Sequence, residues 1–208
     1  MVLNNFPREG KSKTRLGKDI GYKASAQFAK YMLEDIVTVA SKVCSITVAC
    51  PKNDIDDFSR AYPGWDFYQR TQYSLVLGLP DSFRYIYNKN GPKKVIAVTG
   101  DIIINERELD SWFNHLDRFN ILAGPTFDLR FYLGGLDEKY GSQFASYLDK
   151  YPSFANFLNS CISIMAKVPK VKIVKRKIDI DTLDDLKSIS FPDSYRKTKG
   201  FLCQQGYI

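Results

Sequence analysis

Histidine is nearly absent from this chain of 208 residues, which contains His115 and no other. A Ser-His-Asp triad or a histidine-rich metal site would have to be built on that one residue. The four cysteines, Cys44, Cys50, Cys161 and Cys203, include no Cys-x-x-Cys pair. Because structural zinc sites and dithiol redox centres use that spacing, neither class is indicated, and reduced cysteines are expected.

Long apolar runs are also missing. No apolar segment approaches the roughly 20 residues that cross a membrane, and the first residues do not show the apolar core of a secretion signal. We therefore expect a cytoplasmic protein without a membrane span. The sequence does not set the oligomeric state.

Positive charge is in excess, because 30 Lys and Arg face 23 Asp and Glu and give a net charge of +7. This balance favours anionic ligands such as nucleotides, sugar phosphates, nucleic acids or membrane surfaces, without choosing among them. The hydrophobic content of 44% is sufficient for a sizeable core. No linker, repeat or low-complexity segment divides the chain, so we expect one domain over residues 1–208.

Residues 6–16, which read FPREGKSKTRL, combine a turn with closely spaced cations. Proline and glycine interrupt regular structure here, just ahead of a long amphipathic segment. Backbone N–H groups beside the start of a helix, together with lysine and arginine side chains, form a typical phosphate cradle. This basic loop (residues 6–16) is therefore predicted to hold the phosphates of a nucleotide. The alternative is a solvated basic turn.

Strand and helix patterns alternate along most of the chain. Apolar and β-branched runs predict strands at 45–50, 65–69, 93–98, 120–123, 131–133 and 170–178, and helical spacing predicts helices at 21–42, 53–61, 77–88, 106–113, 143–148, 153–165 and 183–189. Val2 and Leu3 would form a short first strand, and Gly134-Gly135 would turn the chain. Residues 191–208 receive no assignment. The alternation predicts an α/β fold with a mostly parallel central sheet flanked by helices.

Two aspartates lie in the segments that follow predicted strands. Asp101 comes after the strand at 93–98, and Asp128 lies in the turn after 120–123. Ligands of open parallel sheets bind beyond the carboxyl ends of the strands, where the basic loop also falls. Asp101 and Asp128 are therefore candidate ligands of Mg²⁺ or Mn²⁺, which prefer oxygen and often bridge to phosphates. An N-cap or an ordinary turn role is the alternative for each.

A basic run at residues 170–177 alternates with valine and isoleucine. This pattern fits the solvated face of an exposed or edge strand. Binding of nucleic acid through the run is the weaker interpretation.

Four blocks of sequence occur in a suggestive order: FPREGKSKTRL, KKVIAVTGD, ILAGPTFDLRFYLGGL and DIDTLDDL. They resemble, in turn, the PxPGxxKTRL loop, the strand ending in GTDSP, the LGPxxDGGYYLxGL segment and the DxDTxxDL segment of the radical-SAM/selenodomain-associated transferases. This glycosyltransferase-like family is related to the molybdenum-cofactor and phospholactate guanylyltransferases. The resemblance covers about residues 6–186. It implies a GT-A, or nucleotide-diphospho-sugar transferase, fold with a bound nucleotide and a divalent cation.

Carried over by position, the resemblance assigns Gly10, Lys13, Thr14 and Arg15 to the phosphates or to the shape of their loop. It makes Asp101 a metal-binding and catalytic carboxylate.

Opposite these residues, the resemblance places Asp128 across the site as a second catalytic or metal-binding carboxylate. Asp181 would support the sheet. The family's two glycines after this aspartate are Leu129 and Arg130 here. Arg130 and Tyr132 therefore fall on the acceptor side, where Arg130 would either contact a phosphate or block the acceptor.

The leading hypothesis is a metal-dependent transferase with a nucleotide-sugar or nucleoside triphosphate donor and a small-molecule acceptor. Glycosyl and nucleotidyl transfer both remain open. The altered turn around Asp128 motivates an alternative, a degenerate protein that binds a nucleotide without turnover. A nucleic-acid-binding protein is the third and weakest hypothesis.

Overall fold

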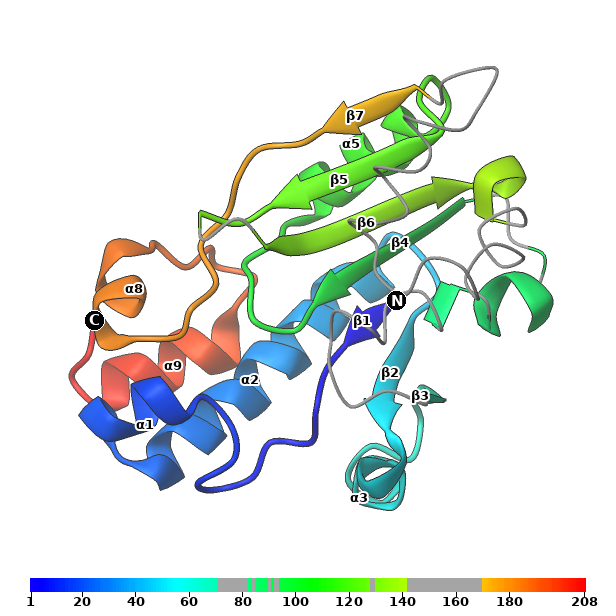
Figure 1. Ribbon diagram of the computed structural model, residues 1–208. Helices are drawn as coiled ribbons and strands as arrows, with labels where there is room; N and C mark the ends of the chain where they lie inside the picture. The colour runs from blue at the N-terminus through cyan, green and yellow to red at the C-terminus, as the bar shows by residue number, and fades with distance from the viewer. Residues whose placement is uncertain (71–81, 84, 90, 92–93, 128–129, 142–169) are drawn as a thin grey trace.

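The computed structural model describes residues 1–70, 82–83, 85–89, 91, 94–127, 130–141 and 170–208. Within them, seven strands form one sheet: β1 (Val2–Leu3), β2 (Thr47–Pro51), β3 (Asp66–Arg70), β4 (Lys94–Thr99), β5 (Ile121–Pro125), β6 (Phe131–Asp137) and β7 (Val171–Ile173). Their order across the sheet is β3-β2-β1-β4-β6-β5-β7 (Figure 1).

The direction of the strands agrees with the predicted sheet. β1 is parallel to both β2 and β4, β2 is parallel to β3, and β5 is parallel to β7. β6 is antiparallel to β4 and to β5, so among the described strands it alone runs in reverse. The prediction of a mostly parallel α/β sheet is confirmed. β7 lies at the edge, as its alternating pattern predicted.

The shortest strand lies near the middle of the sheet. Val2 pairs with Val48 and Val98, and both Val2 and Leu3 are buried. The chain therefore leaves the sheet at Asn4, at the carboxyl end of β1. This position directs the basic loop to the edge where ligands of parallel sheets bind.

The helices are α1 (Thr14–Ile20), α2 (Tyr22–Ser41), the 3₁₀ helix η1 (Lys52–Asp54), α3 (Ile55–Ala61), α5 (Glu106–His115), α8 (Leu183–Ser188) and α9 (Arg196–Gln204). Residues 82–83, 85–89 and 138–141 are also helical. α2 confirms the predicted helix at 21–42. It buries Phe28, Met32, Leu33, Ile36 and Val39 at helical spacing. α2 packs against both α1 and α9, and α8 packs against α1 (Figure 1). None of the helices in the described part of the chain has the length and apolar character of a membrane span.

The sheet has a hydrophobic core on each face because successive strand residues point to opposite sides. In β4, Ile96 and Val98 join one core cluster with side chains of α2, α5 and α9. Val95 and Ala97 join the other, which includes Phe83 of the helical segment 82–89. The arrangement is a three-layer α/β sandwich.

The predicted turn at Gly134-Gly135 is wrong. Gly134 lies opposite Ala97 of β4 and Ala123 of β5, inside the continuous strand β6. A Cβ on Gly135 would come within 3.0 Å of Leu122 Cβ. These glycines therefore permit close packing inside the sheet, a non-local requirement that local turn chemistry does not reveal.

Two further differences concern the second half of the chain. α9 lies within residues 191–208, for which the sequence predicted no helix or strand. The helices predicted at 143–148 and 153–165 lie outside the described residues.

Candidate functional site

The basic loop is a compact turn between β1 and α1. The backbone N–H groups of Lys11 and Ser12 donate to the carbonyl of Arg8, at 3.1 and 3.0 Å. Ser12 Oγ accepts a hydrogen bond from Arg8 N at 2.9 Å. Gly10 adopts φ +70°, a conformation that glycine reaches without steric cost. The loop thus has a defined shape that presents the following residues to the sheet edge.

Lys13 connects this loop with two distant carboxylates. Its Nζ lies 2.8 Å from Asp101 Oδ2 and 2.8 Å from Asp181 Oδ1. Its backbone has φ 48° and ψ 49°, the left-handed region, at the residue that precedes α1. Only 11% of the side chain is exposed. Lys13 therefore joins segments that are 88 and 168 residues away in sequence.

Asp101 and Asp181 are held by backbone contacts. Asp101 lies two residues beyond the end of β4, and its carbonyl accepts a hydrogen bond from Ile180 N at 3.3 Å. Asp185, in the first turn of α8, accepts from the N–H groups of Thr182 at 2.8 Å and Asp181 at 3.1 Å. This capping box fixes the residue that precedes it, so the Asp181 carboxylate is delivered to the site by the start of a helix.

Two arginines approach the same carboxylate of Asp181 from different elements. Arg15, in the first turn of α1, forms an ion pair with Asp181 Oδ2. Arg130, just before β6, lies 3.7 Å from that oxygen and 3.8 Å from Asp179 Oδ2. Both side chains are more than half exposed, which leaves them accessible to an incoming anion.

Burial and charge shift the pKa values of the three groups at the centre. Burial alone would lower the pKa of Lys13, but attraction from Asp101 and Asp181 outweighs it, and that pKa is raised. Burial alone would raise the pKa of Asp101, but the ammonium of Lys13 outweighs it, and that pKa is lowered. Burial, followed by the negative charge of Asp101, raises the pKa of Asp179 to about 7. The Lys13–Asp101 pair is therefore fully ionised at neutral pH.

These groups surround a cavity of about 320 Å³ at the carboxyl edge of the sheet. Its lining consists of Asn4, Asn5, Lys11, Ser12, Lys13, Thr14, Arg15, Ala29, Met32, Gly100, Asp101, Arg130 and Asp181. Arg15 and Arg130 are its exposed charged side chains, whereas Lys13, Asp101 and Asp181 are largely buried. Such a distribution suits an anionic ligand that carries a cation.

Two carboxylate oxygens of the site are available to bind a cation. Asp101 Oδ1 and Asp179 Oδ1 are buried, and neither accepts a hydrogen bond from the described residues. The described residues contain no group of three or more His, Cys, Asp or Glu side chains arranged to hold a metal ion. Mg²⁺ is commonly bound by one or two carboxylates completed by substrate phosphates and water. Asp101 and Asp179 fit this kind of site.

The sequence predictions for the site can now be placed. Lys13, Thr14, Arg15, Asp101 and Arg130 all line the one cavity.

The other predicted residues lie elsewhere. Gly10 shapes the basic loop and is exposed, outside the cavity lining. Tyr132 is buried in the core, where its hydroxyl donates to the carbonyl of Lys175 at 2.9 Å. It therefore does not face the cavity. Asp128 lies outside the described residues.

Asp179 and Asp181 were underestimated from the sequence. Asp181 was expected to support the sheet, and Asp179 was not considered. A signal was present in the alternation Asp179-Ile180-Asp181, because Ile180 is fully buried. When an extended segment buries its middle residue, the two flanking side chains point the other way. Here both reach toward the site.

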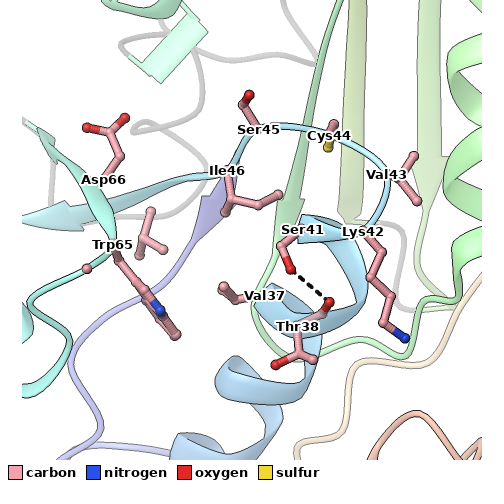
Figure 2. Close-up of a pocket in the computed structure, with 12 residues that line it drawn as sticks. Val37, Thr38, Ser41, Lys42, Val43, Cys44, Ser45, Ile46, Trp65 and Asp66 are labelled. Atoms are coloured by element: carbon pink, nitrogen blue, oxygen red, sulfur yellow. Dashed lines mark hydrogen bonds between the residues drawn. The ribbon is translucent and has the colours of Figure 1, made fainter.

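A second cavity, of about 610 Å³, lies at the opposite edge of the sheet (Figure 2). Figure 2 shows it between the end of α2 and the starts of β2 and β3, with Trp65 on one wall. Its charged side chains have partners: Lys42 pairs with Glu106 at 2.6 Å, and Asp66 accepts a hydrogen bond from Thr47 at 2.6 Å. This cavity is larger, but it gathers no cluster of carboxylates and cations.

Comparison with solved structures establishes the fold. The chain is similar to a candidate nucleotide-diphospho-sugar transferase from Desulfovibrio desulfuricans G20, with a TM-score of 0.76 and 17% identity over 98% of this chain and 96% of that one. It is also similar to CMP:2-keto-3-deoxy-manno-octonic acid synthetase complexed with CTP, with a TM-score of 0.54 and 12% identity over 98% and 97%. A third similar structure is Rv0371c of Mycobacterium tuberculosis H37Rv in complex with manganese, with a TM-score of 0.54 and 13% identity over 90% and 95%.

No family model matches the chain, and no curated protein matches its sequence. The structural likeness confirms the predicted nucleotide-diphospho-sugar transferase fold. The narrower resemblance to the radical-SAM/selenodomain-associated transferases stays a prediction.

Proposed function

We propose that the protein is a metal-dependent nucleotidyltransferase, which transfers the nucleotidyl group of a nucleoside triphosphate to a small anionic acceptor. The observation that carries the proposal is the convergence of Lys13, Arg15 and Arg130 on the carboxylates Asp101 and Asp181 around one cavity. The CTP complex of a protein with the same fold supports a nucleoside triphosphate as donor.

The cations of the basic loop would bind the donor phosphates. Lys13 and Arg15 stand on the side of the cavity formed by the loop after β1. Their charges would neutralise the phosphates and stabilise the negative charge that develops on the leaving group. Arg15 has the planar guanidinium that suits two-point contact with a phosphate.

The carboxylates would hold a divalent cation together with those phosphates. Asp101 and Asp179 offer buried oxygens without hydrogen bonds, and Asp181 lies beside them. When bound, Mg²⁺ or Mn²⁺ would supply positive charge to the reacting phosphate. The manganese complex of Rv0371c supports the choice of a divalent cation.

Arg130 would bind the acceptor. It reaches the cavity from the residue just before β6, an element separate from the basic loop. An acceptor with a phosphate or carboxylate group would be held there with its oxygen toward the donor. That oxygen would form a bond to the α-phosphorus, the bond from the α-phosphorus to the bridging oxygen would break, and pyrophosphate would leave with the bonding electrons.

Thermal shift with a panel of ligands tests the proposal. We expect at least one nucleoside triphosphate to raise the melting temperature with Mn²⁺, by more than nucleotide sugars do, since binding to the folded state stabilises it. Asp101→Asn should remove the Mn²⁺-dependent part of the shift and leave the fold intact. Asp117→Asn is the matched control, because Asp117 is an exposed carboxylate paired with Lys94 at 2.5 Å.

Three results would overturn the proposal. One is the absence of a shift with every nucleoside triphosphate. Another is an undiminished Mn²⁺-dependent shift in Asp101→Asn. The third is a larger shift with a nucleotide sugar, which would favour glycosyl transfer.

A further inference from the structure

The ammonium of Lys13 lies between two carboxylates, in a position that a metal cation could also occupy. It lies 2.8 Å from an oxygen of Asp101 and 2.8 Å from an oxygen of Asp181, and its side chain is nearly buried. Lys13 is also the one non-glycine residue with a positive φ among the described residues. Left-handed backbone is unfavourable for a lysine, so the surrounding contacts must hold it there. The strained backbone and the two ion pairs both indicate a defined position rather than a mobile side chain.

The carboxylates of the site already face at least as much positive charge without any ligand. Asp101, Asp181 and Asp179, whose pKa is about 7, face the cations Lys13, Arg15 and Arg130. Lys11 adds a further cation to the cavity lining. A divalent cation that entered alone would leave the site with a surplus of positive charge next to the Lys13 ammonium. Like charges that share the same carboxylates in a partly buried site repel one another strongly.

We propose that Lys13 serves as an internal cation that competes with the divalent metal for Asp101 and Asp181, and that the donor phosphates relieve this competition by drawing its ammonium away. The inference rests on the proposed function for the identity of the phosphates. It adds that the free protein binds metal weakly and that metal and nucleotide bind cooperatively. By linkage, each ligand raises the affinity for the other by the same factor.

Two observations explain why the site can exchange one cation for another. Asp101 uses Oδ2 for Lys13, whereas its Oδ1 is buried and accepts no hydrogen bond from the described residues. Lys13 therefore satisfies only part of the acceptor capacity of that carboxylate. A metal ion carries twice the charge, so it replaces the ammonium once phosphates offset the excess.

The test is the affinity for Mn²⁺ in the absence of nucleotide, measured on the full chain by electron paramagnetic resonance of free Mn²⁺. Removal of the competing ammonium in Lys13→Met should tighten Mn²⁺ binding about tenfold or more, which corresponds to ~1.4 kcal/mol. Lys11→Met is the matched control: Lys11 lies on the same loop and lines the cavity, but makes no ion pair with Asp101 or Asp181. It should change the affinity less than threefold.

Lys13→Gln repeats the measurement with a neutral polar side chain, and circular dichroism checks that each variant is folded. A simple phosphate-binding role for Lys13 predicts no gain in Mn²⁺ affinity, so an unchanged or weaker affinity in the folded Lys13 variants overturns the inference. Equal gains in Lys11→Met and Lys13→Met also overturn it, since they would indicate a general effect of charge.

The experiments distinguish a failure of this inference from a failure of the proposed function. If no nucleoside triphosphate binds but Lys13→Met gains Mn²⁺ affinity, the competition stands and the transferase proposal fails. If nucleotide and Mn²⁺ bind together but Lys13→Met gains nothing, the transferase proposal stands and the competition fails.

Discussion

The guanidinium of Arg8 forms an ion pair with Asp54, whose other carboxylate oxygen accepts a hydrogen bond from the backbone N–H of Phe6 at 2.8 Å. Asp54 is buried at the end of η1, and Arg8 also pairs with Asp57 in the first turn of α3. The basic loop is thus tied at two points to a segment more than 40 residues further along the chain. Its shape depends on this attachment as well as on its own turn.

Arg8→Ala should weaken both the fold and the binding of a nucleoside triphosphate. It leaves the buried carboxylate of Asp54 without its ion partner, so we expect a loss of about 1–2 kcal/mol in the free energy of unfolding, measured in urea. Loosening of the loop should also reduce the thermal shift caused by a nucleoside triphosphate with Mn²⁺.

Arg60→Ala is the control for Arg8→Ala. Arg60 pairs with Asp57 at 3.5 Å, but 77% of its side chain is exposed. Its removal should change the free energy of unfolding by less than about 0.5 kcal/mol. Equal losses in the two variants would contradict the role given to the buried pair.

Asp35→Ala should be strongly destabilising because Asp35 caps α9 from α2. Its carboxylate accepts hydrogen bonds from Thr198 N at 2.8 Å, Thr198 Oγ1 at 2.7 Å and Lys197 N at 3.3 Å. Both Asp35 and Thr198 are buried, so the variant leaves donors without partners in the core. We expect a loss of about 2–3 kcal/mol in urea unfolding.

Asp193→Ala is the control for Asp35→Ala. Asp193 also lies near the start of α9 and pairs with Lys199 at 2.7 Å, but 98% of its side chain is exposed. It should leave the unfolding transition unchanged. A small effect of Asp35→Ala, similar to that of Asp193→Ala, would show that α9 is held by other contacts.

The thiol of Cys50 should make the protein less stable at alkaline pH. Burial raises its pKa to about 12, whereas the unfolded chain has a thiol pKa of about 8.5. Between these values the folded state keeps a proton that the unfolded state has released, so the free energy of unfolding falls as pH rises above about 8.5.

The measurement compares wild type with Cys50→Ala in urea under reducing conditions. From pH 7.5 to 9.5, wild type should lose about 1.4 kcal/mol more than the variant. Cys44, whose pKa is also raised by burial, is present in both proteins and cancels. Parallel pH profiles of the two proteins would refute the prediction.

Local sequence patterns were sufficient where burial follows a regular period. The helix α2 and the strand β4 were predicted because their apolar residues recur at the spacing of one buried face or form a short buried run. The interior of β6 was missed because Gly134 and Gly135 have the local signature of a turn. Their place is decided by the neighbouring strands, which the local sequence does not contain. α9 was missed for a similar reason, since N–H groups of its first turn donate to Asp35, which lies on another helix.

The site was predictable to the extent that strand ends define it. Lys13, Arg15 and Asp101, which line one cavity, were singled out because they follow predicted strands or lie in a basic turn. The ion pairs of Lys13 and Arg15 with Asp181 depend on the return of the chain after β7, which sequence order alone does not specify. The prediction for Asp128 as a metal ligand remains a prediction, because that residue is not described by the structure.

The carboxylate of Asp181 interacts with two arginines: Arg15 of the basic loop and Arg130, which lies just before β6. A change at Arg130 therefore also alters the hold that the common carboxylate has on Arg15. Substitutions at the two positions are not independent, and their effects on substrate choice will not add. A change of acceptor specificity, by evolution or by engineering, would therefore require coordinated substitutions at residues 15, 130 and 181.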